Sequence, residues 1–409
     1  MLKPHYVPFI FLSLMACSSP KSTPETLKND VQTLASDAFE GRQTGTPAEQ
    51  KAANYIANRF DALGLEPLGT EGFFQTFNFK PSTDPHQETT FVEGEKEGYT
   101  QGTNVVGFLN NRAAQTVIIG AHYDHLGYGT ESSLYRDSIP AIHNGADDNA
   151  SGVATMLHLA GRTKELGTQN NYLFLAFSGE ELGLLGSNYF IKNTPIADTS
   201  YNYMINMDMV GRLKEDKSLA VYGVGTAPVF KQTLTANNNF FKLIFNESGI
   251  GPSDHTSFYL ADIPVLHFFT GQHEDYHKPS DDADKINYAG MEELSDYIIA
   301  LVNDLDNNGK LSFRTTINES EATPRFSVSL GVVPDYLFDG EGMRIDGVSE
   351  GKVAQAVGLQ KGDVVVGLGG EKVTNMMDYM KALSKFKKGD TTTVTINRSG
   401  ASRTFDVVF

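Results

Sequence analysis

The residues of this chain that could do chemistry are histidines and carboxylates next to apolar runs. The central candidate is the segment 144–152, in which Asp147 and Asp148 stand side by side among small and turn-forming residues. The other candidates follow apolar runs before and after it: His122, Glu180, Glu181, Asp208 and His277. Imidazole and carboxylate ligands without thiolates suit zinc, and manganese or cobalt could occupy the same set. The pattern predicts a site for two metal ions.

Each of these residues also has a plainer structural reading. An isolated pair of aspartates is most often an acidic turn, here with Ser151 as a helix cap. Glu180 and Glu181 together could simply open a helix against its dipole. The metal-site interpretation is favoured because the candidates recur in corresponding positions at the ends of several apolar runs.

The chemistry of such a site follows from the ligand types. A bridging carboxylate holds two ions about 3.5 to 4 Å apart and acidifies the water between them toward a pKa of about 7. A base must still take a proton and return it to the leaving amine. Glu180 and Glu181 are neighbours and point in different directions, so one can face an ion and the other the water. Asp124 is placed to accept the second ring proton of His122.

Four apolar runs must position these residues, and each ends just before a candidate. Helical patterns lie between them, including residues 153–166 directly after the Asp-Asp pair. Strands that alternate with helices indicate an α/β sheet, in which ligands collect beyond the carboxyl ends of the strands. The four runs are residues 116–121, 172–177, 203–207 and 264–269. Ahead of them we expect helices at 26–39 and 48–63 and strands at 73–79 and 104–109.

The character of the chain changes after residue 305. We expect a turn-rich, polar linker at residues 306–324 and a second domain at 325–409, where short runs return with glycine punctuation. The strands expected there are residues 326–333, 343–348, 363–368, 391–397 and 404–409. About 85 residues suffice for an independent small domain.

The first residues predict export. Residues 1–16 read as a lipoprotein signal peptide and 17–25 as a tether, with Cys17 as the lipidated residue. We therefore expect a chain that is lipid-anchored to a membrane of the bacterial cell envelope, the outer membrane being favoured because Ser18 gives no retention signal. Cys17 is the only cysteine, so no intramolecular disulfide or thiolate metal site is possible. The net charge of −17 disfavours nucleic acid as a partner.

The segments that carry the candidates resemble the co-catalytic zinc aminopeptidase family, which includes bacterial leucyl aminopeptidases and is related to glutamate carboxypeptidase and glutaminyl cyclase. The matching segments are residues 40–46, 121–125, 145–152, 178–187, 206–209 and 276–281. The resemblance covers residues 26–305. It implies a three-layer zinc-exopeptidase fold with a central mixed, mostly parallel sheet between helices.

The resemblance also implies roles. Asp148, not Asp147, would bridge two Zn²⁺ ions, with a cis peptide bond to Asn149. His122 and Asp208 would complete one ion site, and Glu181 and His277 the other. Glu180 would be the general base, and Tyr276 would polarise the scissile carbonyl. His125, His143, His255 and His273 are then pocket or structural residues.

Residues 325–409 resemble a PDZ domain, particularly at residues 354–363. That resemblance implies that the loop Leu330-Gly331-Val332 holds the C-terminal carboxylate of a peptide, which would add to a sheet edge. The plainer reading is a β-rich appendage that only packs on the first domain.

Together these observations predict a di-zinc exopeptidase that releases amino-terminal residues from peptides by attack of a metal-bridged hydroxide. Two alternatives stay open. One is a glutaminyl cyclase-like acyl transferase, which normally uses one zinc ion. The other is a catalytically inert adaptor whose PDZ domain binds protein C-termini.

Overall fold

The computed structural model describes residues 22–80, 91–92, 98–130, 132–162, 166–197, 200–317, 328–338, 340–349 and 351–409. The expected signal peptide, most of the tether and Cys17 lie outside these residues. Among the described residues, no helix is both long enough and apolar enough to cross a membrane.

The first domain is built on one mixed sheet, with the spatial order β3-β2-β4-β6-β5-β7-β10-β8-β9 and β1 paired with β4. The central strands β6, β5, β7 and β10 run parallel, β8 and β9 also pair in parallel, and the remaining pairs are antiparallel. The expected mixed sheet is therefore confirmed, with its parallel part at the centre. In chain order the strands are β1 (Glu66–Pro67), β2 (Phe74–Phe79), β3 (Phe91–Val92), β4 (Thr100–Leu109), β5 (Gln115–His122), β6 (Asn170–Phe177), β7 (Tyr201–Met207), β8 (Ser218–Tyr222), β9 (Lys242–Phe245) and β10 (Val265–Phe269).

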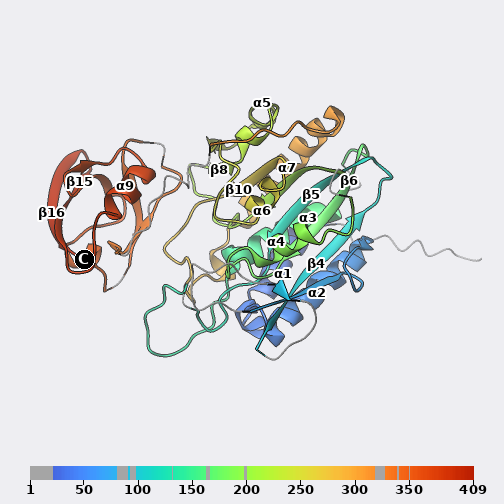
Figure 1. Cartoon of the computed structure of the whole chain (residues 1–409), viewed down its shortest axis with the longest axis horizontal. Helices are drawn as coiled ribbons and strands as arrows, with labels where there is room; N and C mark the ends of the chain where they lie inside the picture. The colour runs from blue at the N-terminus through green and yellow to red at the C-terminus, as the bar shows by residue number, and fades with distance from the viewer. Residues whose placement is uncertain are drawn as a thin grey trace, which may run out of the picture.

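Helices cover both faces of this sheet (Figure 1). One face carries α1 (Pro24–Leu34), α2 (Pro47–Leu63), α3 (Gly152–Gly161), α5 (Phe230–Ala236) and α7 (Tyr288–Leu305), and the other carries α4 (Leu185–Lys192) and α6 (His255–Tyr259). Parallel strands covered on both faces read as continuous apolar runs, as seen in β5, β6 and β7. Two hydrophobic cores result, one under each helical layer.

Local sequence signals explain where the amino-terminal helices begin and end. Thr46 caps α2 by accepting a hydrogen bond from the amide of Glu49, and Pro47 occupies the first helical position. Gly64 ends the same helix in the left-handed conformation with φ of 78°. The helix α3 is shorter than expected, because it ends at Gly161 and not at residue 166.

The second domain has its own sheet and its own hydrophobic core. The sheet order is β11-β12-β13-β15-β16, with β14 paired with β13, so β11 lies at an edge. The elements are β11 (Val332–Pro334), β12 (Met343–Val348), α8 (Val353–Ala356), β13 (Val364–Leu368), β14 (Glu371–Lys372), α9 (Met376–Leu383), β15 (Thr391–Arg398) and β16 (Ala401–Val408).

Part of the expected linker packs on the first domain. The amide of Leu311 donates to the side chain of Asn202, and the amide of Arg314 donates to the carbonyl of Thr226. Residues 311–317 therefore extend the first domain beyond α7. The rest of the expected linker, residues 318–324, and the first residues of the expected second domain, 325–327, lie outside the described residues.

Candidate metal centre

The four central parallel strands end at one edge of the sheet and bring the predicted residues together. His122 is the last residue of β5, Glu180 and Glu181 follow β6, and Asp208 follows β7. His277 lies in the loop after β10. This is the edge where ligands collect in open α/β sheets. The sixth residue, Asp148, sits in a turn at residues 146–151 that leads into α3.

Asp148 lies between the two imidazoles. Its Oδ1 is 3.4 Å from Nε2 of His122, and its Oδ2 is 3.2 Å from Nε2 of His277. Nε2 of His122 is also 3.4 Å from Oδ1 of Asp208, and Nε2 of His277 is 3.3 Å from Oε2 of Glu181. The peptide bond between Asp148 and Asn149 is cis, as the family resemblance implies.

These separations fit ligands of shared metal ions better than hydrogen bonds. Two ligand atoms at about 2.0 to 2.1 Å from one tetrahedral zinc ion lie about 3.3 to 3.4 Å apart. Nε2 of His122 is buried and has no hydrogen-bond partner among the described residues. An orphaned imidazole nitrogen facing two carboxylates has the chemistry of a metal ligand. The donor set therefore fits zinc.

The ionisation of the cluster shows how the carboxylates and imidazoles depend on each other. Burial would lower the pKa of His122, but the carboxylates of Asp208 and Glu180 raise it well above its ordinary value. Burial would raise the pKa of Asp148, but the neighbouring histidines hold it well below its usual range. Asp148 is therefore held as an anion, which is the form of a carboxylate that binds cations.

His125 belongs to this cluster, although the sequence marked it only as a pocket or structural residue. Its Nδ1 lies 2.8 Å from Oε1 of Glu181 and 3.8 Å from Oδ2 of Asp148. His125, Asp148 and Glu181 form one group of metal-binding type, and His122, Glu180 and Asp208 form another. The sequence signal for it was the spacing of the two histidines, since His125 follows His122, the last residue of β5, by three residues.

Asp124 faces the second ring nitrogen of His122. Its carboxylate lies 3.6 Å from Nδ1 of His122, and its main-chain carbonyl oxygen lies 3.2 Å from the same atom. The carboxylate also accepts hydrogen bonds from the hydroxyl of Thr44 and the amide of Glu180. Asp124 thus positions the loop that carries both glutamates. For His277, Nδ1 faces the carbonyl oxygen of Ser132 at 2.9 Å.

Asp147 faces away from the cluster and braces the turn. Its Oδ1 accepts from the amide of Gly211 at 2.6 Å, and its Oδ2 lies 3.1 Å from Nε2 of His273. The carboxylate of Asp281 accepts from the amides of both Asp147 and Asp148. Of the two adjacent aspartates, only Asp148 faces the imidazoles of His122 and His277.

Arg42 ties three parts of the site to one buried guanidinium. It has no solvent exposure and donates to four main-chain carbonyls, those of Leu34, Tyr123, Asn144 and Gly145, at 2.6 to 2.9 Å. Two of these carbonyls directly precede the turn at residues 146–151, and one belongs to Tyr123, which follows His122. Burial lowers the pKa of Arg42 to about 10, against the carboxylates of Asp148 and Asp124, so it remains charged at neutral pH.

Two further buried residues, Asp254 and His255, lie behind the site, and His255 was expected to be a pocket or structural residue. Asp254 is fully buried, and neither of its carboxylate oxygens has a hydrogen-bond partner among the described residues. Burial raises the pKa of Asp254 to about 7. His255 stacks on His267 with ring centroids 4.5 Å apart, and burial holds the pKa of both below the ordinary histidine value.

A cavity of about 220 Å³ opens beside the cluster. Tyr276 lines it and stacks on His277 with ring centroids 3.8 Å apart. Burial and the carboxylates of Asp148 and Glu181 raise the pKa of Tyr276 well above its ordinary value, so its hydroxyl stays a hydrogen-bond donor.

In the second domain, the structure describes the loop Leu330-Gly331-Val332 that was expected to hold a peptide carboxylate. Gly331 has φ of +77° and its amide donates to the hydroxyl of Ser329, while Leu330 is buried and Val332 begins β11.

Comparison with known proteins gives one match for each domain. Residues 104–302 match the model of Peptidase family M28, and residues 312–408 match that of the PDZ domain. The chain is similar to the alkaline phosphatase isozyme conversion protein of Escherichia coli strain K12, with 31% identity over 202 residues that cover 48% of this chain and 54% of that protein. It is also similar to aminopeptidase YwaD of Bacillus subtilis strain 168, with 28% identity over 221 residues that cover 49% of this chain and 44% of that protein. The chain thus spans about half the length of these relatives.

A solved structure, that of BSAP, a zinc aminopeptidase from Bacillus subtilis, has the same fold. It aligns with a TM-score of 0.54 and 18% identity, covering 73% of this chain and all of that one. At this level of identity the likeness concerns the fold alone. The zinc-exopeptidase fold and the PDZ-type second domain expected from the sequence are confirmed.

Proposed function

We propose that the protein is a di-zinc aminopeptidase, from the premise that residues 104–302 match the model of Peptidase family M28 and residues 312–408 match that of the PDZ domain. The observation that carries the proposal is the position of Asp148, whose two oxygens face the imidazoles of His122 and His277. One carboxylate between two histidines is the arrangement that a bridged pair of ions requires.

In this proposal His122 and Asp208 would hold one ion, Glu181 and His277 would hold the other, and Asp148 would be a ligand of both. When bound, zinc ions polarise a peptide carbonyl and lower the pKa of water, which are the two contributions that hydrolysis at neutral pH needs. His125 and Asp124 then act as positioning residues, because they hold Glu181 and the amide of Glu180.

The protein's own groups move the protons. Glu180 lines the cavity next to the group of His122 and Asp208. Burial raises the pKa of Glu180. The nearby carboxylates of Asp208 and Glu181 raise it further, whereas His122 lowers it. A carboxylate in such surroundings can take a proton from the attacking water and deliver it to the leaving amine as the C–N bond breaks. The hydroxyl of Tyr276 donates a hydrogen bond to the carbonyl oxygen of the peptide bond that is cleaved.

The alternatives differ from this proposal in metal content and product. A one-zinc acyl transferase would cyclise amino-terminal glutamine and bind one ion per chain. An inert adaptor would bind peptides without cleaving them. The ligand sets for two ions, together with Glu180, support hydrolysis.

The test is hydrolysis with controlled metal content. Full-length protein is treated with a chelator, reloaded with zinc and given matched peptides with a free or an acetylated amino terminus. We expect two zinc ions per chain by mass spectrometry and release of the first residue from the free peptide only. Activity that survives complete zinc removal, or one ion with glutamine cyclisation, would contradict the proposal.

We further propose that the protein is anchored to an envelope membrane by a lipid on Cys17 and acts outside the cytoplasm. The apolar run that ends in Ala16 and Cys17, followed by a polar segment, supports this. Cys17→Ser should move the protein from the membrane fraction to the soluble fraction. Unchanged membrane association of that variant would refute the anchor.

A further inference from the structure

The cavity beside the metal cluster is lined by both domains. Its floor includes Asp148, Glu181 and Asp208, all from the first domain. One lining residue, Tyr336, comes from the second domain, where it follows strand β11. Tyr336 is 42% exposed, so it stands on the solvent side of the cavity. The second domain therefore completes the cavity wall.

Tyr336 extends an aromatic surface of the first domain. Its ring centroid lies 6.4 Å from that of Phe269 at an interplanar angle of 68°, which is an edge-to-face contact. Phe269 stacks on His267, and His267 contacts Tyr222. Aromatic rings give large apolar contact area with few rotatable bonds. These rings form a wall suited to an apolar side chain.

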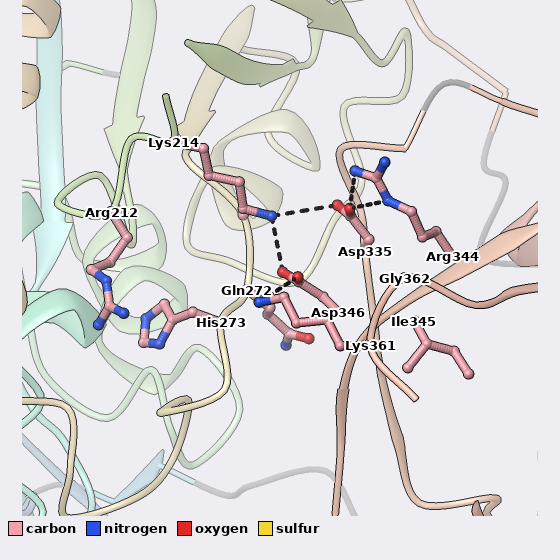
Figure 2. Close-up of a pocket in the computed structure, with 11 residues that line it drawn as sticks. Arg212, Lys214, Gln272, His273, Asp335, Arg344, Ile345, Asp346, Lys361 and Gly362 are labelled. Atoms are coloured by element: carbon pink, nitrogen blue, oxygen red, sulfur yellow. Dashed lines mark hydrogen bonds and ion pairs between the residues drawn. The ribbon is translucent and has the colours of Figure 1, made fainter. Parts of the chain in front are cut away.

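Ion pairs between the domains hold the segment that carries Tyr336 (Figure 2). Nζ of Lys214, in the first domain, lies 2.9 Å from Oδ2 of Asp346 and 3.8 Å from Oδ1 of Asp335. Arg344 donates through Nε to Asp335 at 2.7 Å, and Lys361 lies 3.1 Å from Asp346. Because Asp335 directly precedes Tyr336, this network, which we term the Lys214 latch, fixes one side of the tyrosine.

The residue on the other side of Tyr336 is fixed by packing. Leu337 is buried and lies against Gly271, where an added Cβ would come within 2.8 Å of the leucine side chain. Asp335 and Asp346 are also buried. Burial would raise the pKa of Asp346, but the ammonium groups of Lys214 and Lys361 lower it, so it stays an anion that pairs with both. Tyr336 thus sits between two anchored neighbours.

We propose that the PDZ domain, through Tyr336, supplies part of the substrate pocket and selects peptides whose amino-terminal residue has a large apolar side chain. This inference rests on the proposed aminopeptidase activity and names the substrate class of the same site. The Lys214 latch is the device that holds the selecting residue in place.

The experiment compares Tyr336→Ala and Tyr336→Phe in full-length, zinc-loaded protein with leucyl, phenylalanyl and alanyl p-nitroanilides. An aromatic contact contributes enough to change kcat/KM by roughly three- to tenfold. We expect Tyr336→Ala to lose about that factor for the leucyl and phenylalanyl substrates, mainly through KM, and to change little for the alanyl substrate. Tyr336→Phe should keep the wild-type preference.

The latch gives a second variant that leaves the cavity side chains intact. Lys214→Gln should shift the preference in the same direction as Tyr336→Ala. The matched control is Lys231→Gln, because Lys231 pairs with Glu247 at an exposed site within the first domain. That control should keep the wild-type preference. An equal fall for all three substrates, or no change, in Tyr336→Ala with its zinc intact would overturn the inference.

A binding measurement separates this inference from the proposed function. Calorimetric titration with free L-phenylalanine and L-alanine reports the pocket without catalysis. If Tyr336→Ala binds phenylalanine more weakly but binds alanine as the wild type does, Tyr336 is part of the pocket. That result would hold even if no peptide were hydrolysed, in which case only the proposed activity fails. Hydrolysis with unchanged amino-acid binding in that variant means that the inference fails and the activity stands.

Discussion

At the scale of single residues, adjacent acidic side chains serve different neighbours because successive side chains point apart. Asp147 accepts from Gly211 and faces His273, whereas Asp148 faces His122 and His277. Glu180 groups with His122 and Asp208, whereas Glu181 contacts His125 and His277. Each pair therefore separates a ligand from a residue with another role, and substitution tests that division.

Replacing Glu180, the proposed general base, should remove turnover and leave the metal in place. Glu180→Gln keeps the shape of the side chain but cannot take a proton, and general-base catalysis contributes about 10² to 10⁴ in rate. We expect kcat to fall by about that factor while zinc content by mass spectrometry stays at the wild-type value. Near-normal turnover in this variant would show that Glu180 is not the base.

Replacing Asp148, the proposed shared ligand of the two ions, should remove the metal itself. Asp148→Ala leaves His122 and His277 without the carboxylate between them, so we expect both ions to be lost on dialysis and activity to vanish. Asp147→Asn is the matched control, since Asp147 braces the turn through Gly211 and does not face the imidazoles. It should keep its zinc. Loss of a single ion from Asp148→Ala would mean that the two ions do not share this ligand.

Glu49 makes stability depend on pH away from the ligands. Its buried carboxylate accepts from the amides of Gly45 and Thr103 and the hydroxyl of Ser178, at 2.5, 2.9 and 2.6 Å. Burial raises the pKa of Glu49 from 4.5 to about 7, although these hydrogen bonds lower it. Because the folded pKa is the higher one, the stabilisation from the bound proton is fully present below pH 4.5 and is lost as the pH rises through about 7.

The measurement is a difference between wild type and Glu49→Gln, which cannot titrate. We expect the free energy of unfolding of the wild type to fall relative to the variant by up to about 3 kcal/mol between pH 4.5 and pH 7.5. Urea unfolding at both pH values gives this change. A difference that is the same at both pH values would mean that Glu49 has an ordinary pKa.

At the scale of elements, Arg42 shows how separate segments are held in register. Its guanidinium joins the end of α1, the segment after β5 and the turn before Asp148 through four carbonyl oxygens. Arg42→Lys keeps the charge but loses the planar fork, so most of these carbonyls are left unpaired. We expect a lower unfolding temperature and zinc affinity reduced about 10- to 100-fold.

The control for that variant is Arg162→Lys. Arg162 pairs with Asp296 at the carboxyl end of α3, the end opposite the turn that carries Asp148, and its replacement should leave zinc affinity unchanged. Competition with a chromophoric chelator measures both affinities. Equal zinc affinity in Arg42→Lys and wild type would show that the turn carrying Asp148 holds its position without Arg42.

The elements also show what the sequence could and could not predict. The strand ends that deliver His122, Glu181 and Asp208 were predictable, because buried parallel strands read as apolar runs and the ligands follow them directly. The hydrogen bonds of Arg42 were not predictable, because its partners are main-chain carbonyls that no residue pattern marks. The short strands β8 and β9 and the end of α3 at Gly161 were also missed, since tertiary packing sets them.

At the scale of the whole molecule, the second domain lies at one side of the first (Figure 1) and meets it at the cavity beside the metal cluster. Tyr336 could not be assigned to the site from the sequence, because nothing local in the chain relates it to residues of the first domain. The sequence predicted two domains and a linker, whereas the structure shows ion pairs between them through Lys214. The PDZ domain therefore contacts the first domain directly and contributes a residue, Tyr336, to its cavity.

The position of β11 leads to a prediction about both domains at once. The loop Leu330-Gly331-Val332 leads into this edge strand, whose first residue is Val332, and Tyr336 at the cavity follows the strand. At about 3.3 Å per residue, a peptide of at least about six residues whose carboxylate meets the loop would run along β11 toward the catalytic cavity. We expect such peptides to have a lower KM with a free carboxyl terminus than with an amidated one.

The decisive comparison is an octapeptide acid and its amide, assayed with wild type and with Gly331→Val. Gly331 has φ of +77°, and an added Cβ would meet the side chain of Lys352 at 2.1 Å, so the variant should distort the loop without touching the first domain. It should hydrolyse acid and amide equally, and a dipeptide, which is too short to reach the loop, should be unaffected. If the wild type already treats the octapeptide acid and amide alike, the loop does not hold the carboxyl terminus of the substrate, and the PDZ domain contributes to the pocket through Tyr336 alone.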